Sequence, residues 1–168
     1  MKPDEGARPD GTWERDEVLV AWVYGSILAG AAVVGAGKIA DTVGRASLYV
    51  AVTGTVVWLA HSYAAFVGHG GRIDLDGRGK RLRHAHAAEA SILVSFVPAV
   101  AALLVCSLLD TPLSTAGFVA LGVTILTMAW AAATAARRTG AEAGGSALAA
   151  LGALLIGGTL IAAKVALK

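Results

Sequence analysis

Two ionisable side chains, His61 and Glu89, fall inside apolar stretches of the sequence. An ionisable group at membrane depth is rare and costly, which makes it a candidate for function. At about 1.5 Å per helical residue, His61 lies roughly 10 Å and Glu89 roughly 6 Å from the same end of two consecutive segments. Tyr24 falls at a similar depth in the first apolar stretch, and Tyr63 follows His61 closely. We therefore predict a polar layer in which His61 and Glu89 form a titratable pair, with Tyr24 and Tyr63 as hydrogen-bonding neighbours.

The His61–Glu89 pair supports two interpretations. Histidine changes its charge near neutral pH after small changes in its surroundings, so the pair can act as a proton relay or gate. Alternatively, the two side chains satisfy each other, or Tyr24, by hydrogen bonding and fix the register of the helices. The sequence leaves both interpretations open, and they lead to different functions.

A second group of metal-ligand residue types lies at the start of the third apolar stretch. His86 and Glu89 are three residues apart, so they share one face if a helix already starts near Arg83. Imidazole and carboxylate ligands suit zinc or iron, and His84 would complete such a site by reaching round the helix. The spacing matches no specific zinc motif. We therefore expect no cofactor, and keep a metal site at His84, His86 and Glu89 as an alternative.

The loop before these histidines carries a run of four basic residues, Arg78, Lys80, Arg81 and Arg83. Such a run fits the anionic lipid headgroups of the inner leaflet. The formal net charge of +2 is too small to argue for nucleic acid. The sequence contains no phosphate-binding glycine loop, nucleophile elbow or His-Glu-x-x-His motif. We therefore expect lipid rather than nucleic acid as the partner, and no enzymatic activity.

The elements that position these residues are predicted to be membrane-spanning helices. Of the 168 residues, 56% are hydrophobic and 15% are charged, and the charges cluster between long apolar stretches. A spanning helix needs about 20 consecutive apolar residues. The sequence therefore predicts an all-α fold, a polytopic membrane bundle of about five transmembrane helices. The apolar stretches are Val18 to Gly37, Ser47 to Gly68, Ala85 to Leu109, Leu113 to Ala136 and Ser146 to Leu167.

The lysines and arginines predict the orientation, because they are enriched in cytoplasmic loops. With the N-terminus inside, most of the 14 lysines and arginines lie on the cytoplasmic side, and Lys38, Arg45, Lys164 and Lys168 lie outside. An N-in, C-out orientation follows. The first residues mix both charge signs and lack the pattern of a cleavable signal peptide. We expect residues 1–17 to form a charged cytoplasmic segment and residues 18–168 a five-helix transmembrane domain, multi-pass in the bacterial cytoplasmic membrane.

Small residues and one proline predict how the helices pack. Ser26 and Gly30 in the first stretch, and Ala153 and Gly157 in the fifth, are spaced four residues apart. Small residues at this spacing let two helices approach closely. We expect the first and fifth helices to pack tightly, within one chain or across a homo-oligomer. Pro98 removes a backbone donor in the middle of the third stretch, which predicts a kink there.

Three fragments carry a resemblance to a known family. They are Val23-Tyr24-Gly25, the run WLAHSYA from Trp58 to Ala64, and the ending around Lys164, together with Glu89 at the opening of the next span. These fragments resemble the small multi-span membrane proteins of unknown function found in high-GC actinobacteria. The resemblance touches most of the chain. It implies a multi-span membrane protein and no particular activity.

Three functions fit the sequence. The first is a small ion- or proton-coupled transporter or channel subunit that uses the His61–Glu89 pair. The second is a non-catalytic membrane scaffold or accessory subunit whose polar layer is structural. The third is a metal-dependent membrane enzyme centred on His84, His86 and Glu89.

Overall fold

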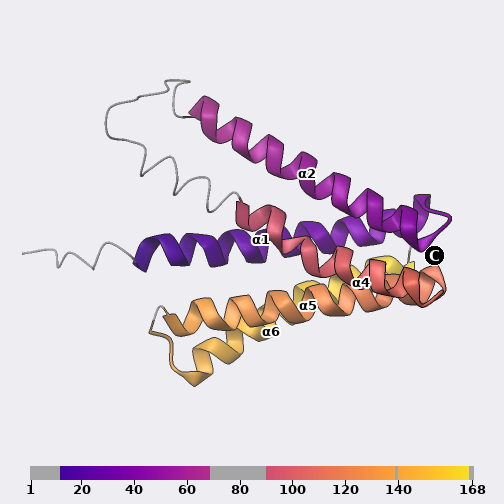
Figure 1. The fold of residues 1–168 in the computed structure, drawn as a ribbon. Helices are drawn as coiled ribbons and strands as arrows, with labels where there is room; N and C mark the ends of the chain where they lie inside the picture. The colour runs from indigo at the N-terminus through magenta and orange to yellow at the C-terminus, as the bar shows by residue number, and fades with distance from the viewer. Residues whose placement is uncertain (1–11, 69–89, 139, 167–168) are drawn as a thin grey trace, which may run out of the picture.

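The computed structural model describes residues 12–68, 90–138 and 140–166, and these residues form helices and short turns without any strand. Figure 1 shows the helices running back and forth along one common direction. Residues 90–95 are also helical and lead into α4. The bounds of the labelled helices are α1 Thr12–Ile39, α2 Val43–Gly68, α4 Val97–Leu108, α5 Leu113–Arg138 and α6 Ala143–Ala166.

Five helical stretches are long and apolar enough to cross a membrane, which confirms the predicted all-α fold with five such segments. They are Val18–Ile39, Val43–Ala64, Ala90–Leu108, Leu113–Arg138 and Ala143–Ala166. Helix α1 itself begins earlier than the apolar stretch, at Thr12. The apolar stretch defines the length that can span a bilayer and not the end of the helix.

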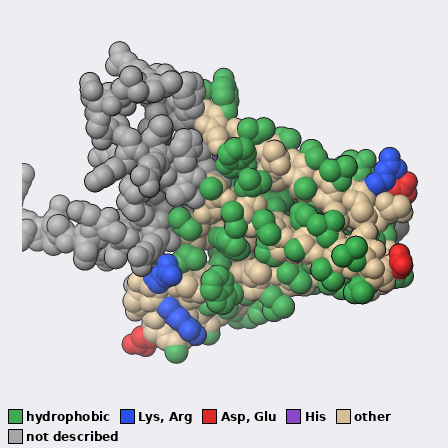
Figure 2. Space-filling model, in the orientation of Figure 1, with side chains coloured by type: hydrophobic (Ala, Val, Ile, Leu, Met, Phe, Trp, Pro, Cys, Tyr) green, Lys and Arg blue, Asp and Glu red, His purple; other side chains and the backbone are tan. Residues whose placement is uncertain are grey.

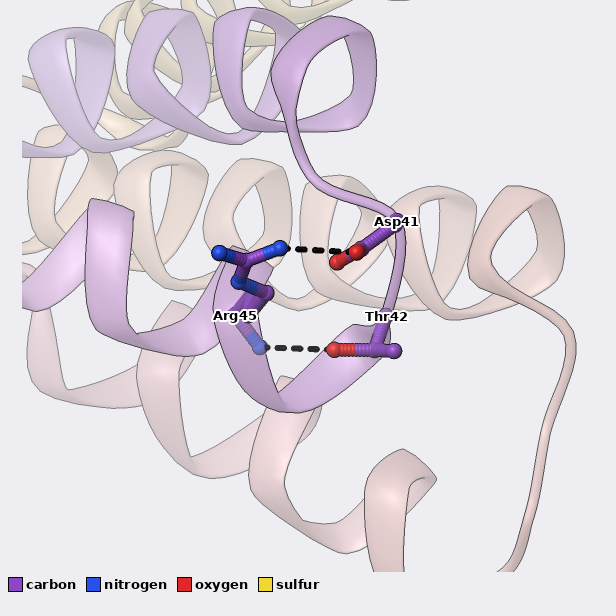
Figure 3. Close-up of polar contacts among 3 residues, drawn as sticks. All are labelled: Asp41, Thr42 and Arg45. Carbon is purple, nitrogen blue, oxygen red and sulfur yellow. Dashed lines mark hydrogen bonds and ion pairs between the residues drawn. The ribbon is translucent and has the colours of Figure 1, made fainter.

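Helix α2 begins at a local cap rather than at the start of the predicted apolar stretch. The hydroxyl of Thr42 accepts a hydrogen bond from the backbone N–H of Arg45 at 3.2 Å (Figure 3). This bond satisfies one of the free N–H groups in the first turn. The Arg45 guanidinium also donates to the Asp41 carboxylate at 2.7 Å. The cap and the charge pair both lie in the short turn between the end of α1 at Ile39 and the first turn of α2, which begins at Val43.

Two of the turns end their helices in the same way. After α4, the N–H of Thr111 bonds the carbonyl of Cys106, and the N–H of Asp110 bonds that of Ser107. After α5, the N–H of Ala141 bonds the carbonyl of Ala136, and that of Gly140 bonds Arg137. This pair of bonds is the Schellman motif, which needs a left-handed residue at the turn. Gly140 supplies it with a φ of 83° and Asp110 with a φ of 49°.

The third span is broken where Pro98 was predicted to kink it. Helical residues 90–95 end in a turn at Phe96, and α4 starts at Val97 with Pro98 in its first turn. The N–H of Phe96 bonds Leu93 three residues back rather than four. Proline has no N–H to continue the ladder, and its ring clashes with the preceding turn. The Ser95 hydroxyl donates to the carbonyl of Ile92 at 2.6 Å and so adds a local bond beside the break.

Helix α5 is central to the bundle and packs against α1, α4 and α6. Its Leu121 and Met128 are almost fully buried, as are Val33 of α1 and Leu103 of α4. Helices α1 and α6, the predicted first and fifth helices, both pack closely against α5 and less extensively against each other. A Cβ added to Gly30 of α1 would lie 2.6 Å from Leu160 Cδ1 of α6. Absent side chains at such positions let the helices approach.

The outer surface of the bundle is apolar between two charged ends. Figure 2 shows hydrophobic side chains over the middle of one face and the charged side chains near its two ends. Large apolar side chains such as Leu59, Leu126 and Leu155 are more than half exposed. A soluble monomer rarely exposes apolar surface on this scale. The described helices therefore belong to a multi-pass membrane protein.

Candidate functional site

Tyr24 of α1 and His61 of α2 are brought together, as the predicted polar layer requires. Their ring centroids are 5.5 Å apart and the ring planes are inclined by 58°. His61 is half-buried and Tyr24 is 44% exposed. Both residues lie within candidate membrane spans. The bundle thus places an imidazole ring and a phenol ring in contact within its apolar zone.

The contact of His61 with its own helix indicates which ring nitrogen is basic. Nδ1 lies 3.1 Å from the carbonyl oxygen of Val57, one turn earlier in α2. A carbonyl only accepts hydrogen bonds, so this bond requires the proton to be on Nδ1. In the neutral imidazole Nε2 then holds the free lone pair. Nε2 is therefore the atom at which His61 would take up a proton or accept a further hydrogen bond.

Two further polar atoms lie close in sequence to this contact and are fully buried. Trp22 Nε1 on α1 and Ser62 Oγ on α2 have no hydrogen-bond partner among the described residues. Leaving a buried donor unsatisfied costs about 1–3 kcal/mol. Such groups are exceptions that require a reason, and in membrane proteins that reason is commonly function. Trp22 Nε1 and Ser62 Oγ are therefore two further buried polar atoms at about the same depth along α1 and α2 as Tyr24 and His61.

The described start of the third span also reaches this layer, beside Tyr24. Gly25 follows Tyr24 on α1, and a Cβ added to it would lie 3.0 Å from the Ile92 carbonyl oxygen and 3.1 Å from the Ile92 Cα. It would also overlap the hydroxyl of Ser95. The backbones of α1 and of residues 90–95 can come this close because Gly25 has no side chain. Three parts of the chain therefore meet at one level.

The remaining predicted site residues are separated from this contact or fall outside the described residues. Tyr63 is 69% exposed, and a residue two positions after His61 lies on nearly the opposite side of a helix. It therefore does not join the layer with Tyr24. Among the described residues, no three histidine, cysteine or acidic side chains are grouped so that they could hold a metal ion. Outside the described residues lie Glu89, His84 and His86, and the basic run Arg78, Lys80, Arg81 and Arg83.

The buried polar atoms of Trp22 and Ser62 were not predictable from the sequence. Each is adjacent, or nearly so, to a residue that was singled out, since Trp22 precedes Tyr24 by two positions and Ser62 follows His61. Tryptophan and serine are common in membrane helices, so residue type alone carries no signal. Only the contacts show that their polar atoms are buried without partners among the described residues.

His61 Nε2 is the ring nitrogen left to accept a hydrogen bond, and the Tyr24 ring lies beside the imidazole. No protein-family model, no curated protein and no solved structure matches the chain. The functional argument therefore rests on the layer itself.

Proposed function

We propose that the chain is a multi-pass protein of the bacterial cytoplasmic membrane with its N-terminus inside and its C-terminus outside. The five apolar helices and their exposed apolar side chains support insertion. Arg137 and Arg138 close α5 at one end of the bundle. The opposite end carries Lys38 and Lys164 in the last turns of α1 and α6. The excess of lysine and arginine across the whole sequence supports placing the Arg137 end inside.

We further propose that the protein is a small ion- or proton-coupled transporter or channel subunit. The observation that carries this proposal is the contact of Tyr24 and His61 at 5.5 Å between helices that both qualify as membrane spans. An ionisable ring in such a position is costly and marks ion pathways and proton relays in membrane proteins. Glu89 remains the proposed partner of His61 by its place in the sequence, three residues before Ile92.

A non-catalytic scaffold or accessory subunit is the second candidate, and one contact favours it. His61 Nδ1 bonds the carbonyl of Val57 in its own helix, which partly satisfies the ring without any ion or substrate. In that case the Tyr24–His61 contact fixes the register of α1 against α2. The polar layer would then contribute to stability alone.

Proton flux in liposomes separates the two candidates. The purified full chain is reconstituted, a pH gradient is applied, and the internal pH is followed with a trapped dye. We expect flux in the wild type that His61→Phe abolishes, because phenylalanine keeps an aromatic ring and removes the titrating nitrogen. Glu89→Gln tests the proposed partner in the same assay.

Thr55→Ala is the matched control on α2. The Thr55 side chain is exposed, and among the described residues its hydroxyl bonds the Ala51 carbonyl of the same helix, so flux should be unchanged. Folding of each variant is checked by its thermal unfolding in detergent. A wild type that conducts nothing under any gradient, with a His61→Phe variant that only loses stability, would replace the transport proposal with the scaffold.

A further inference from the structure

The break in the third span leaves its two parts joined by few backbone hydrogen bonds. The N–H of Phe96 bonds the carbonyl of Leu93, three residues back. Pro98 lies in the first turn of α4 and has no N–H to bond the carbonyl of Val94. Sharp kinks of long helices occur at such positions. The part of the span before the break, residues 90–95, can therefore change direction relative to α4 with little loss of hydrogen bonding.

The α4 side of the break is anchored in the hydrophobic core. Phe96 is 2% exposed, and a Cβ added to Gly54 of α2 would be 2.8 Å from its ring. Phe96 and Leu103 belong to a cluster of buried apolar residues that also includes residues of α1, α2 and α5. Ile92 is buried but lies outside this cluster. Phe96 is therefore a fixed point, and the half-span of residues 90–95 is the part that can move.

The half-span meets α1 at Gly25 through its backbone rather than through interlocking side chains. A Cβ added to Gly25 would lie 3.0 Å from the Ile92 carbonyl oxygen and overlap the Ser95 hydroxyl. The Ser95 hydroxyl donates to the Ile92 carbonyl of its own helix at 2.6 Å. The Ser26 hydroxyl, next to Gly25, donates to the Trp22 carbonyl of its own helix at 2.8 Å. Neither of these two bonds has to break when the half-span moves away from α1.

The faces of α1 and α2 that meet the third span also carry buried polar atoms. Trp22 precedes Gly25 by three residues, so the two share one face of α1. Ser62 follows Gly54 by eight residues, a spacing that places both on one face of α2. Trp22 Nε1 and Ser62 Oγ are buried and have no hydrogen-bond partner among the described residues. Movement of the half-span away from these faces would let water bond both atoms.

We propose that residues 90–95 form a gate that pivots at Phe96 away from Gly25 and admits water beside the Tyr24–His61 contact. Tyr24 immediately precedes Gly25, so the separation takes place next to this contact. Interrupted helices line the sites of membrane transporters, where one part moves against another. The role of the gate in transport rests on the proposed function, whereas the movement itself does not.

The movement is tested by the reactivity of a thiol at a buried position of α2. The one cysteine of the chain is removed by Cys106→Ala, and Ser62→Cys is introduced as a reporter. The full chain is held in nanodiscs and treated with a small water-soluble thiosulfonate. We expect the reporter to react, and Pro98→Ala to slow the reaction by about fivefold, because alanine restores one hydrogen bond that opening must break.

Val105→Ala on α4 and a second reporter, Glu142→Cys, are the matched controls. Val105 is 55% exposed and lies beyond the break, so Val105→Ala should leave the reaction rate of Ser62→Cys unchanged. Glu142 is exposed and lies outside the candidate spans, so Glu142→Cys should react equally fast with and without Pro98→Ala. A Ser62→Cys reporter that never reacts overturns the gate. A reaction that Pro98→Ala does not slow, or that Val105→Ala slows as much, also overturns it.

A disulfide lock tests the role of the gate in proton flux, again with Cys106→Ala. Gly25→Cys with Ser95→Cys joins α1 to the half-span, because a Cβ at Gly25 falls at the Ser95 side chain, within reach of a disulfide. Gly44→Cys with Ser107→Cys is the matched control. It joins α2 to α4 away from the break, where a Cβ added to Gly44 would be 3.8 Å from the Ser107 hydroxyl oxygen.

We expect oxidation of the Gly25→Cys, Ser95→Cys pair to stop flux and reduction to restore it, while the oxidised control pair conducts like the wild type. Unchanged flux through the oxidised pair overturns the gate, and so does an equal loss of flux in the oxidised control. A wild type without any flux overturns the transport proposal, and the reactivity of Ser62→Cys then decides alone whether the half-span moves. The same comparison decides if the cysteine pair does not fold, because Pro98→Ala adds no bulk at Gly25.

Discussion

Gly25→Ala tests how much the close approach of the third span to α1 contributes to stability. The new methyl group would lie 3.0 Å from the Ile92 carbonyl oxygen and overlap the Ser95 hydroxyl. Ser95 would have to rotate away and lose its 2.6 Å bond to that carbonyl. The Ile92 backbone, which has no rotamer to change, would have to move by a few tenths of an ångström.

The size of the effect follows from two opposing contributions. Overpacking a close contact costs about 1–3 kcal/mol. Replacing glycine by alanine inside a helix gains about 0.5–1 kcal/mol. Gly35, on the same helix, faces open space with no atom within 4 Å of an added Cβ, so Gly35→Ala should show the gain alone. The difference in unfolding free energy between the two variants therefore reports the packing cost, about 1–3 kcal/mol.

The assay is unfolding of each purified variant in mixed micelles by a denaturing detergent, followed by circular dichroism. We expect Gly25→Ala to unfold before the wild type and Gly35→Ala to unfold at or after it. Ser95→Ala combined with Gly25→Ala should recover part of the loss, because it removes the overlapping hydroxyl. Equal stability of the Gly25→Ala and Gly35→Ala variants would show that α1 and residues 90–95 are not in contact at this point.

Two further predictions concern the α1–α2 turn. Thr42→Ala should lower the unfolding free energy by about 1 kcal/mol, because the cap of α2 is lost. The same unfolding assay on Thr55→Ala gives the effect of losing a threonine hydroxyl within the helix. Equal losses of unfolding free energy in the two variants would argue against a cap at Thr42. The hydrogen bond from Arg45 holds the pKa of Asp41 below its ordinary value of 3.8. The charge pair should therefore persist at neutral pH and be lost only as the pH falls through that lowered value. An NMR titration should show the Asp41 pKa rising in Arg45→Gln, and an unchanged pKa would exclude the pairing.

The spans and turns were predictable because local chemistry decides them. The thickness of a bilayer sets the length of an apolar stretch, and Gly140 and Pro98 impose a turn and a break through their own backbone restrictions. The central place of α5 was not predictable. Its surroundings are apolar on every side, as for the other spans. The apolar residues therefore show no helical periodicity that would mark the face of α5 that meets its neighbours.

The polar layer was predictable in part. The depth of His61 and Tyr24 follows from their distance along each apolar stretch, and these two rings do meet. Depth alone gives no direction around the helix axis, so Tyr63 was placed in the layer although it is exposed on α2. The burial of Trp22 Nε1 and Ser62 Oγ depends on packing between helices, which the order of residues along one helix does not contain.

The break at Phe96 has a consequence for the order in which the protein is assembled. Before the break, Ile92 and Ser95 lie against Gly25 of α1. At the break, Phe96 lies against α2, where a Cβ added to Gly54 would be 2.8 Å from its ring. Figure 1 shows α2 diverging from α1 toward the end where residues 90–95 begin. The chain is synthesised from its N-terminus. Helices α1 and α2 are therefore made before residues 90–96. Residues 92–96 contact α1 at Gly25 and α2 at Gly54, and these contacts form only after both helices have been made.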